Sequence, residues 1–228
     1  MQQSEDNRYT VQICPLCGSE AYFLQSAFNR DYWDCPVCGG VFLSPDQLLS
    51  PEMEYREYCT HNNDVHDKRY QKFVMPLVNL VTEHHMIGHI GLDFGAGSGP
   101  VITKLLQDRG YTVNLYDPYF HPDTSVLDTT YNFIVACEVA EHFYHPEETF
   151  RQLEKMLKPN GILYCRTELL TDAVDFSQWR YVREATHVFF YRPQTIHWIA
   201  TYLATVSATI HSNTICSFQK SHLPHPSC

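Results

Sequence analysis

The sequence has no long hydrophobic run. None of its apolar stretches approaches the roughly 20 residues that a membrane span needs. Its first ten residues, MQQSEDNRYT, also lack the basic-then-apolar pattern of an export signal. We therefore expect a cytoplasmic protein with no membrane partner. In that compartment its nine cysteines indicate metal ligands and buried thiols, not a disulfide framework.

Positive charge is scarce as well. The chain has 16 Lys and Arg against 26 Asp and Glu, a formal charge of −10. Residues 1–60 hold three arginines and nine acids, which gives −6 and leaves −4 for the remainder. Nucleic-acid binding usually requires a basic surface, so these totals argue against an RNA partner, although a local basic patch is compatible with them.

Glycine is sparse too, with ten residues, yet three of them stand in the stretch LDFGAGSGP at 92–100. A dinucleotide-binding loop reads G-x-G-x-x-G, but Pro100 occupies the position of the third glycine. A P-loop requires Gly-Lys-Ser/Thr, and the next lysine is Lys104. Neither phosphate-binding pattern is present.

The chain divides by its patterns into a cysteine-punctuated segment (1–45), a proline-marked connector (46–64), an α/β region (65–220) and a frayed tail (221–228). Apolar residues at helical spacing predict a helix over 70–81, capped by Asn63 or Asp64. From residue 89 strands and helices alternate, which predicts a doubly wound, mostly parallel sheet ending in a hairpin at Ser212-Asn213. A helix from 146 is expected to stop at Pro159 and Gly161, before a strand over 162–168.

Four cysteines have the spacing of a zinc site. Cys14-x2-Cys17 and Cys35-x2-Cys38 are separated by 17 residues, and each pair can bring two thiolates to a metal about 2.3 Å away. Four sulfur ligands leave no open coordination position, so the zinc is predicted to be structural, in a small zinc ribbon. The alternative is four unrelated buried thiols.

The glycine loop is flanked by two acids at strand ends. Asp93 precedes the loop, and Asp117, at the end of the next predicted strand, is placed to accept hydrogen bonds from both hydroxyls of a ribose. The amides at the start of the following helix suit a carboxylate. An adenosine joined to an amino acid, without phosphates, matches such a site. The alternative is a tight structural turn.

These motifs resemble those of the class I S-adenosylmethionine-dependent methyltransferases. LDFGAGSG is similar to their first motif, LYDPYF to the acid of their second strand, and NFIVACEVAEHFYHPEETFRQLEKMLKPNGILY to the run from their fourth strand to their fifth. The resemblance covers about residues 65–219. The cysteine segment looks like modules fused to some methyltransferases of sugars and of ribosomal RNA.

The resemblance implies S-adenosylmethionine as cofactor and assigns roles to matching positions. The methionine part would lie over the glycine loop, the ribose against Asp117, and Tyr70 would close over the ligand. The predicted cofactor residues are Tyr70, Asp93, Gly95, Ala96, Gly97, Asp117, Pro118, Tyr119 and Glu138.

The segment between Asp117 and Phe133 departs from the family pattern. Its 15 residues cannot hold a helix, a third strand and a return to the sheet, since one parallel crossover alone needs about a dozen residues. We expect that helix to be missing and the third strand shortened or absent. Tyr119 and Phe120 would then shield the cofactor, and another chain of an oligomer, the ribbon or solvent would cover the gap. Asp128 is the nearest counterpart of the family's adenine-side acid.

Two histidines are candidate bases for the methyl acceptor. His142 follows the predicted fourth strand, at the carboxyl edge of the sheet, and its alternative role is to fix the turn there. His187 is the second candidate. It lies in an aromatic stretch that is expected to wall an acceptor pocket or to form a lid that excludes water: Trp179, Tyr181, Phe189, Phe190 and Tyr191.

The sequence thus predicts a methyltransferase acting on a small molecule, a sugar or an aromatic metabolite. An RNA or protein methyltransferase is the second reading, suggested by the ribbon and opposed by the acidic charge. A catalytically idle cofactor-binding module that mediates interactions is the third.

Overall fold

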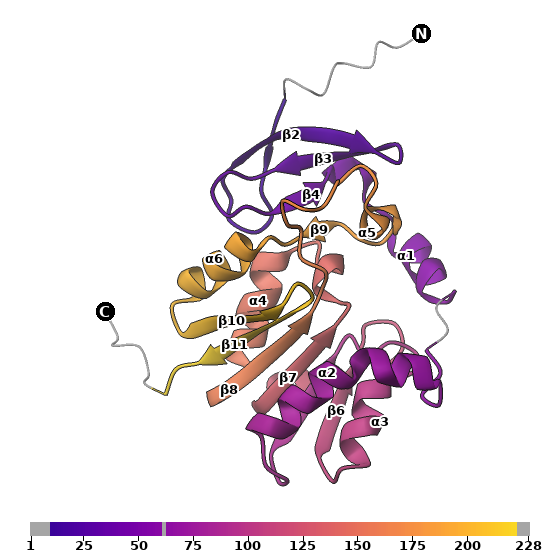
Figure 1. Cartoon of the computed structure of the whole chain (residues 1–228), viewed down its shortest axis with the longest axis vertical. Helices are drawn as coiled ribbons and strands as arrows, with labels where there is room; N and C mark the ends of the chain where they lie inside the picture. Colours follow the sequence, from indigo (N-terminus) through magenta and orange to yellow (C-terminus); the bar gives the residue numbers. More distant parts are fainter. Residues whose placement is uncertain (1–9, 61–62, 223–228) are drawn as a thin grey trace.

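The computed structural model describes residues 10–60 and 63–222. The first nine residues of the expected ribbon and residues 223–228 of the expected tail lie outside the described residues. The chain forms a large six-stranded sheet and a small five-stranded sheet, which lie next to each other (Figure 1). In the described ranges no helix is both long and apolar enough to cross a membrane.

The large sheet has the strand order β10-β11-β8-β7-β5-β6. Four of its strands run parallel, and β11 lies antiparallel between β8 and β10. The expectation of a doubly wound, mostly parallel sheet is therefore confirmed. The strands are β5 (Ile90–Phe94), β6 (Thr112–Tyr116), β7 (Tyr131–Cys137), β8 (Leu157–Arg166), β10 (Val206–Ser212) and β11 (Ile215–Lys220).

Helices cover both faces of this sheet (Figure 1). On one face lie α2 (Lys68–His84) and α3 (Val101–Gln107), and on the other α4 (Pro146–Lys155) and α6 (Pro193–Leu203). The predicted helix over 70–81 is present as α2, but neither Asn63 nor Asp64 caps it. Asp67 does so through the amide of Arg69, because Asp64 instead accepts the amide of His66 in the turn before the helix.

Helix α4 and strand β8 meet earlier than predicted. The helix ends at Lys155, and the strand already begins at Leu157 instead of 162. Leu157 pairs with Tyr131 of β7, and a bulge at the next residues restores the register at Ile162. Pro159 and Gly161 therefore mark an irregular strand start and not the end of the helix, because pairing with β7 extends the strand.

The third strand of the family pattern is absent. The residues between β6 and β7 are all described, and they contain one short 3₁₀ helix, η3 (Thr124–Asp128), and no strand of the sheet. The sheet consequently has six strands, as the short crossover predicted. Asp128 is exposed on η3.

The small sheet combines the cysteine segment with a distant strand. Its order is β1 (Val11–Ile13), β2 (Glu20–Ala27), β3 (Arg30–Asp34), β4 (Val41–Leu43) and β9 (Phe189–Phe190). β9 follows α5 (Arg180–Arg183) in the predicted acceptor-pocket stretch. A Cβ on Gly40 would lie 2.3 Å from the ring of Phe189, so only glycine permits this close approach.

The predicted aromatic pocket wall is largely wrong for this reason. Phe189 and Tyr191 are buried in the core that the two sheets share, and Trp179 and Phe190 are buried where residues 170–190 pack against the small sheet. Of the predicted wall, Tyr181 and His187 line the large cavity at the carboxyl edge of the sheet.

Candidate active site

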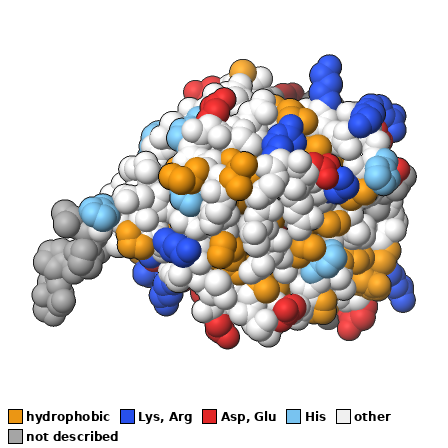
Figure 2. All heavy atoms as spheres, turned by 90° about the horizontal axis from the view of Figure 1, so that it is seen from below, with side chains coloured by type: hydrophobic (Ala, Val, Ile, Leu, Met, Phe, Trp, Pro, Cys, Tyr) orange, Lys and Arg blue, Asp and Glu red, His pale blue; other side chains and the backbone are white. Residues whose placement is uncertain are grey.

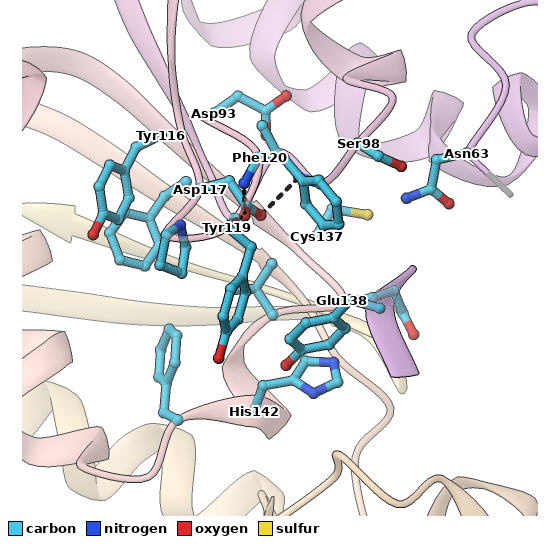
Figure 3. A pocket seen from close by; sticks show the side chains of 18 of the residues that line it. Asn63, Asp93, Ser98, Tyr116, Asp117, Tyr119, Phe120, Cys137, Glu138 and His142 are labelled. Carbon is cyan, nitrogen blue, oxygen red and sulfur yellow. Dashed lines mark hydrogen bonds between the residues drawn. The ribbon is translucent and has the colours of Figure 1, made fainter. Parts of the chain in front are cut away.

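A cavity of about 870 Å³ lies at the carboxyl ends of β5, β6 and β7. Open α/β sheets bind ligands at this edge. Every predicted cofactor residue and both candidate bases line it: Tyr70, Asp93, Gly95, Ala96, Gly97, Asp117, Pro118, Tyr119, Glu138, His142 and His187. Asp93 and Asp117 lie toward one end and His142 toward the other, with Tyr119 between them (Figure 3).

The glycine loop needs its glycines for both conformation and space. Gly95 and Gly97 have φ of 76° and 63°, and a Cβ on Gly95 would lie 2.5 Å from Val139. A Cβ on Gly99 would meet the carbonyl oxygen of Asn63 at 1.6 Å. Asn63 also lines the cavity. From the sequence, Asn63 was predicted only as a possible helix cap. Nothing in the local pattern indicates that it lies against the glycine loop.

Asp117 organises the loop before any ligand is present. One carboxylate oxygen accepts the Gly97 amide at 2.9 Å, and the other accepts the amides of Tyr119 and Phe120 at 2.9 and 3.0 Å. A carboxylate has about four lone-pair positions, so these three bonds leave capacity for a ligand hydroxyl. The same side chain therefore holds two loops together and presents an acceptor to the cavity.

Asp93 is a fully buried acid beneath the loop. Its Oδ2 accepts the hydroxyl of Thr103 at 2.8 Å. Burial raises the pKa of Asp93 to about 6, although the Thr103 hydrogen bonds act in the opposite direction. The native protein thus keeps this proton at pH values where the unfolded chain has already lost it.

We expect Asp93→Asn to stabilise the ligand-free protein at neutral pH. The folded pKa lies above the unfolded one, so the wild type loses stability as pH rises from about 4 through 6, and the asparagine variant does not. The gain above pH 6 is bounded by about 3 kcal/mol, from a shift of roughly two pKa units. Urea unfolding of both proteins at pH 5 and 7.5 measures it. Asp128→Asn, on the exposed η3, is the control, and an equal gain in both variants would contradict the assignment.

The connector packs against the loop that follows β6. The ring of Tyr119 lies 5.6 Å from the rings of both Tyr55 and Tyr58 on α1 (Pro51–Tyr58). Glu54 of α1 accepts hydrogen bonds from the hydroxyls of Tyr58 and Tyr119 at 2.8 and 2.7 Å. The connector thus closes the cavity beside the predicted adenine side through Glu54 and Tyr58, whereas η3 packs against the sheet next to β6. Tyr119 and Phe120 line the cavity there.

The two candidate bases lie together at the other end. The rings of His142 and His187 are 4.8 Å apart, and Tyr58 lies 5.4 Å from His142. Nδ1 of His142 is 2.9 Å from the carbonyl of Thr186, and Nδ1 of His187 is 2.8 Å from that of Tyr181. Because a carbonyl only accepts hydrogen bonds, both Nδ1 atoms carry a proton, which leaves Nε2 as the nitrogen that can bind a further proton or a metal.

Glu141 lies beside His142 and His187, and the sequence had not predicted it as a site residue. Its side chain is fully buried, and its Oε1 accepts the hydroxyl of Tyr181 and lies 3.9 Å from Nε2 of His187. Its Oε2 has no hydrogen-bond partner among the described residues. Burial raises the pKa of both Glu141 and Glu138. The Oε1 atom of Glu138 lies 3.4 Å from Nε of Arg166. Glu141 adjoins His142 in the stretch EVAEH at 138–142, and this position next to a candidate base is the signal by which it could have been predicted.

The cavity lining is acidic. Among the described residues that line it are a single Arg, Arg180, and six acids: Glu54, Asp93, Asp117, Glu138, Glu148 and Glu184. This charge balance favours a cationic ligand over one that carries phosphates.

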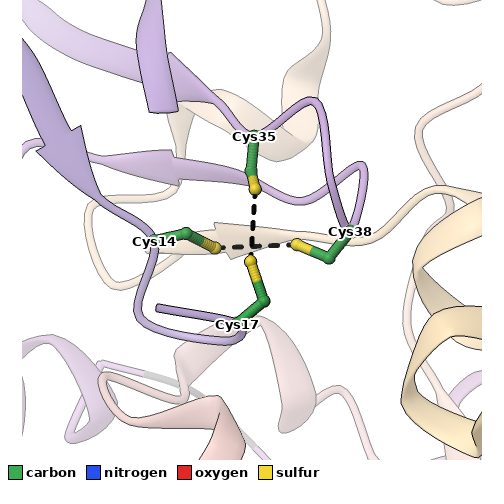
Figure 4. A group of neighbouring side chains, drawn as sticks. All are labelled: Cys14, Cys17, Cys35 and Cys38. Atoms are coloured by element: carbon green, nitrogen blue, oxygen red, sulfur yellow. Dashed lines mark hydrogen bonds between the residues drawn. The ribbon is translucent and has the colours of Figure 1, made fainter. Parts of the chain in front are cut away.

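The four predicted metal ligands converge in the small sheet (Figure 4). Their sulfur atoms all lie within 4.8 Å of one another, with Cys14 and Cys38 at 3.6 Å and Cys17 and Cys35 at 3.3 Å. Sulfurs at the corners of a tetrahedral zinc site are about 3.8 Å apart, for Zn–S bonds of about 2.3 Å. The geometry of the quartet fits such a centre.

Residues 59–202, more than half of the chain, match the family described as the methyltransferase domain. The chain belongs to this family. The match begins at the end of α1 and includes the glycine loop, Asp117, His142 and His187. The residues that line the cavity therefore belong almost entirely to the methyltransferase region.

Solved structures share the fold of this methyltransferase. An O-methyltransferase family protein from Burkholderia thailandensis is 15% identical over 68% of this chain and 61% of its own, with a TM-score of 0.50. The 1,6-didemethyltoxoflavin-N1-methyltransferase of the same organism, with bound 1,6-didemethyltoxoflavin and S-adenosylhomocysteine, is 12% identical, covers 87% of this chain and 99% of its own, and has a TM-score of 0.53. The methyltransferase thus spans less than two thirds of the first structure. No curated protein matches it.

Proposed function

We propose that the protein transfers a methyl group from S-adenosylmethionine to a small aromatic acceptor. The observation that carries this proposal is a single cavity that joins the glycine loop and Asp117 at one end to an aromatic, histidine-bearing end at the other. Its volume of about 870 Å³ is near the upper limit for small-molecule sites, so it suits a cofactor and a small acceptor together.

The cofactor end suits S-adenosylmethionine better than a dinucleotide. Gly95 and Gly97 let backbone approach the methionine part, and Asp117 has acceptor capacity for the ribose hydroxyls. The positive sulfonium is favoured by the acidic lining, which would repel a diphosphate. The bound S-adenosylhomocysteine of the toxoflavin methyltransferase supports this choice.

The acceptor end favours an aromatic ring over a sugar. The rings of Tyr58 and Tyr181 lie beside His142 and His187 there, and aromatic rings pack well against such side chains. The toxoflavin enzyme, with bound 1,6-didemethyltoxoflavin, likewise acts on a small molecule. An RNA acceptor is disfavoured by the charge of −10; on the face shown in Figure 2, Lys and Arg side chains are scattered among acidic and apolar ones.

The reaction is an in-line displacement in which positioning provides much of the rate. When bound, S-adenosylmethionine supplies an electrophilic methyl group. Tyr119 and α1 exclude water from the cofactor side, and Asp117 fixes the ribose. His142 and His187 act on the acceptor atom that receives the methyl group, since both line the far end of the cavity.

We also propose a structural zinc in the four-cysteine site. Its ribbon supports the acceptor end, because β4 pairs with β9 and the amide of Leu43 donates to the carbonyl of Val188 at 2.9 Å. Arg192, at the start of α6, binds both Asp34 and the carbonyl of Gly39 at 2.7 Å. The ribbon thereby holds the segment that carries His187.

Calorimetry with the purified full chain tests the cofactor assignment. S-adenosylmethionine and S-adenosylhomocysteine are expected to bind in a one-to-one ratio, and NAD is expected to give no heat, because the acidic cavity opposes its phosphates. Binding of NAD in their place would refute the proposal. Labelled S-adenosylmethionine with pools of aromatic metabolites, sugars, RNA and protein then identifies the acceptor class. Cofactor binding without transfer to any pool would favour the idle module.

A further inference from the structure

We propose that Glu141, His142 and His187 form a second metal site, which binds a divalent transition ion of the zinc type at the acceptor end of the cavity. One potential ligand atom from each residue lies within 4.8 Å of the others. Two ligands of one ion at about 2.1 Å are at most about 4.2 Å apart, so small side-chain movements complete the site.

Both imidazoles are already held in the form that a metal requires. Each donates Nδ1–H to a backbone carbonyl, His142 to Thr186 and His187 to Tyr181. Metal-bound histidines usually make this bond with the nitrogen that does not face the ion, which fixes the tautomer and aims Nε2 at the metal.

The carboxylate provides the second, independent observation. Glu141 is fully buried, Tyr181 holds its Oε1, and its Oε2 lacks a hydrogen-bond partner within the described ranges. A buried polar atom without a partner is costly, and a bound cation would satisfy it. Arg166 does not hydrogen-bond Oε2 of Glu141 either, and its Nε lies 3.4 Å from Oε1 of Glu138.

The chain fixes the three residues from both sides. Glu141 and His142 lie on η4 (Ala140–His142), directly after β7. The amide of Val188 donates to the carbonyl of Glu141 at 2.9 Å, which holds the neighbouring His187 against that helix. Two imidazoles and one carboxylate are a common catalytic zinc set, and unlike the four-cysteine site they leave an open coordination position.

The ion's role rests on the proposed function. An acceptor hydroxyl at the open position binds through its oxygen, and the ion lowers the hydroxyl pKa so that its proton leaves to water. The oxygen lone pair then forms the O–CH₃ bond while the S–CH₃ bond breaks, and that electron pair returns to sulfur, giving a neutral thioether. The two histidines thus act as ligands and not as the base, and the favoured acceptor is a phenol.

Cobalt titration of the full chain tests the site. Wild type is expected to bind one Co²⁺ at the cysteines, with an intense thiolate absorption, and one more that shows only weak ligand-field bands. His187→Ala should weaken the second event at least a hundredfold and leave the thiolate band intact. Glu141→Gln, which keeps the side-chain volume, should weaken it at least tenfold. His145→Ala, another histidine of the cavity, is the matched control and should leave metal affinity unchanged.

The outcomes separate this inference from the proposed function. A wild type that binds Co²⁺ only at the cysteines, or variants that bind the second ion as well as wild type does, would overturn the metal site, and a protonated Glu141 would then explain its burial. S-adenosylhomocysteine calorimetry on the same samples reports on the cofactor site alone. Its retention in His187→Ala and Glu141→Gln also shows that these variants are folded.

Discussion

Replacement of Cys38 by serine is expected to remove the zinc from the four-cysteine site and to unfold the small sheet. Structural zinc supplies folding free energy directly, on the order of 10 kcal/mol in small zinc domains. The loss should extend beyond the ribbon. β9 pairs with β4, so the segment with His187 loses its support, whereas the glycine loop and Asp117 stand on the large sheet.

Metal analysis, limited proteolysis and calorimetry measure these effects together. The variant should contain no zinc at the cysteines, become cleavable in residues 167–191, and retain binding of S-adenosylhomocysteine. Cys59→Ser is the matched control, because Cys59 is exposed and lies outside the quartet. A Cys38→Ser protein that stays fully folded, or a wild type that lacks zinc, would contradict the assignment.

Replacement of Asp117 by alanine is expected to cost about 3 kcal/mol in cofactor binding, roughly a hundredfold in Kd. Two effects combine in this variant. The ribose loses a charged acceptor, and the amides of Gly97, Tyr119 and Phe120 lose theirs. The glycine loop and the Tyr119 loop are then no longer held together before the cofactor arrives.

Calorimetry with S-adenosylhomocysteine measures the loss. Asp128→Ala removes the same charge from the same crossover, but Asp128 is exposed on η3 and does not line the cavity, so its affinity should match wild type. An Asp117→Ala protein that binds as tightly as wild type would show that the ribose lies elsewhere. Equal losses in both variants would indicate a general charge effect in place of a direct contact.

The local pattern of the sequence was enough for much of the fold. Alternating strands and helices predicted the parallel sheet, and a crossover of 15 residues predicted its missing strand, because chain length limits what a segment can span. Helix ends were less predictable: Asp67 caps α2, and pairing with β7 starts β8 at Leu157. Both depend on contacts that compete with the local signals.

The residues of the cavity also differ in how far the local sequence predicts them. Asp93, Gly95, Gly97 and Asp117 were found because each stands at a strand end or in a turn, and parallel strands bring such ends to one edge. Their roles in binding stay predictions. Glu54 and Glu141 were missed because their partners lie far away in the chain: the hydroxyl of Tyr119 reaches Glu54 across 65 residues, and that of Tyr181 reaches Glu141 across 40.

The sequence by itself determined the α/β sheet, the cysteine spacing and the glycine loop with its acids. Each of these depends on periodicity, spacing or backbone freedom within a short segment. The tertiary structure alone decided that α1 packs against Tyr119, that β9 joins the ribbon and buries most of the aromatic stretch, and that His187 lies against Glu141 and His142. These outcomes follow from which apolar surfaces pack together across the whole chain, and no local pattern specifies that choice.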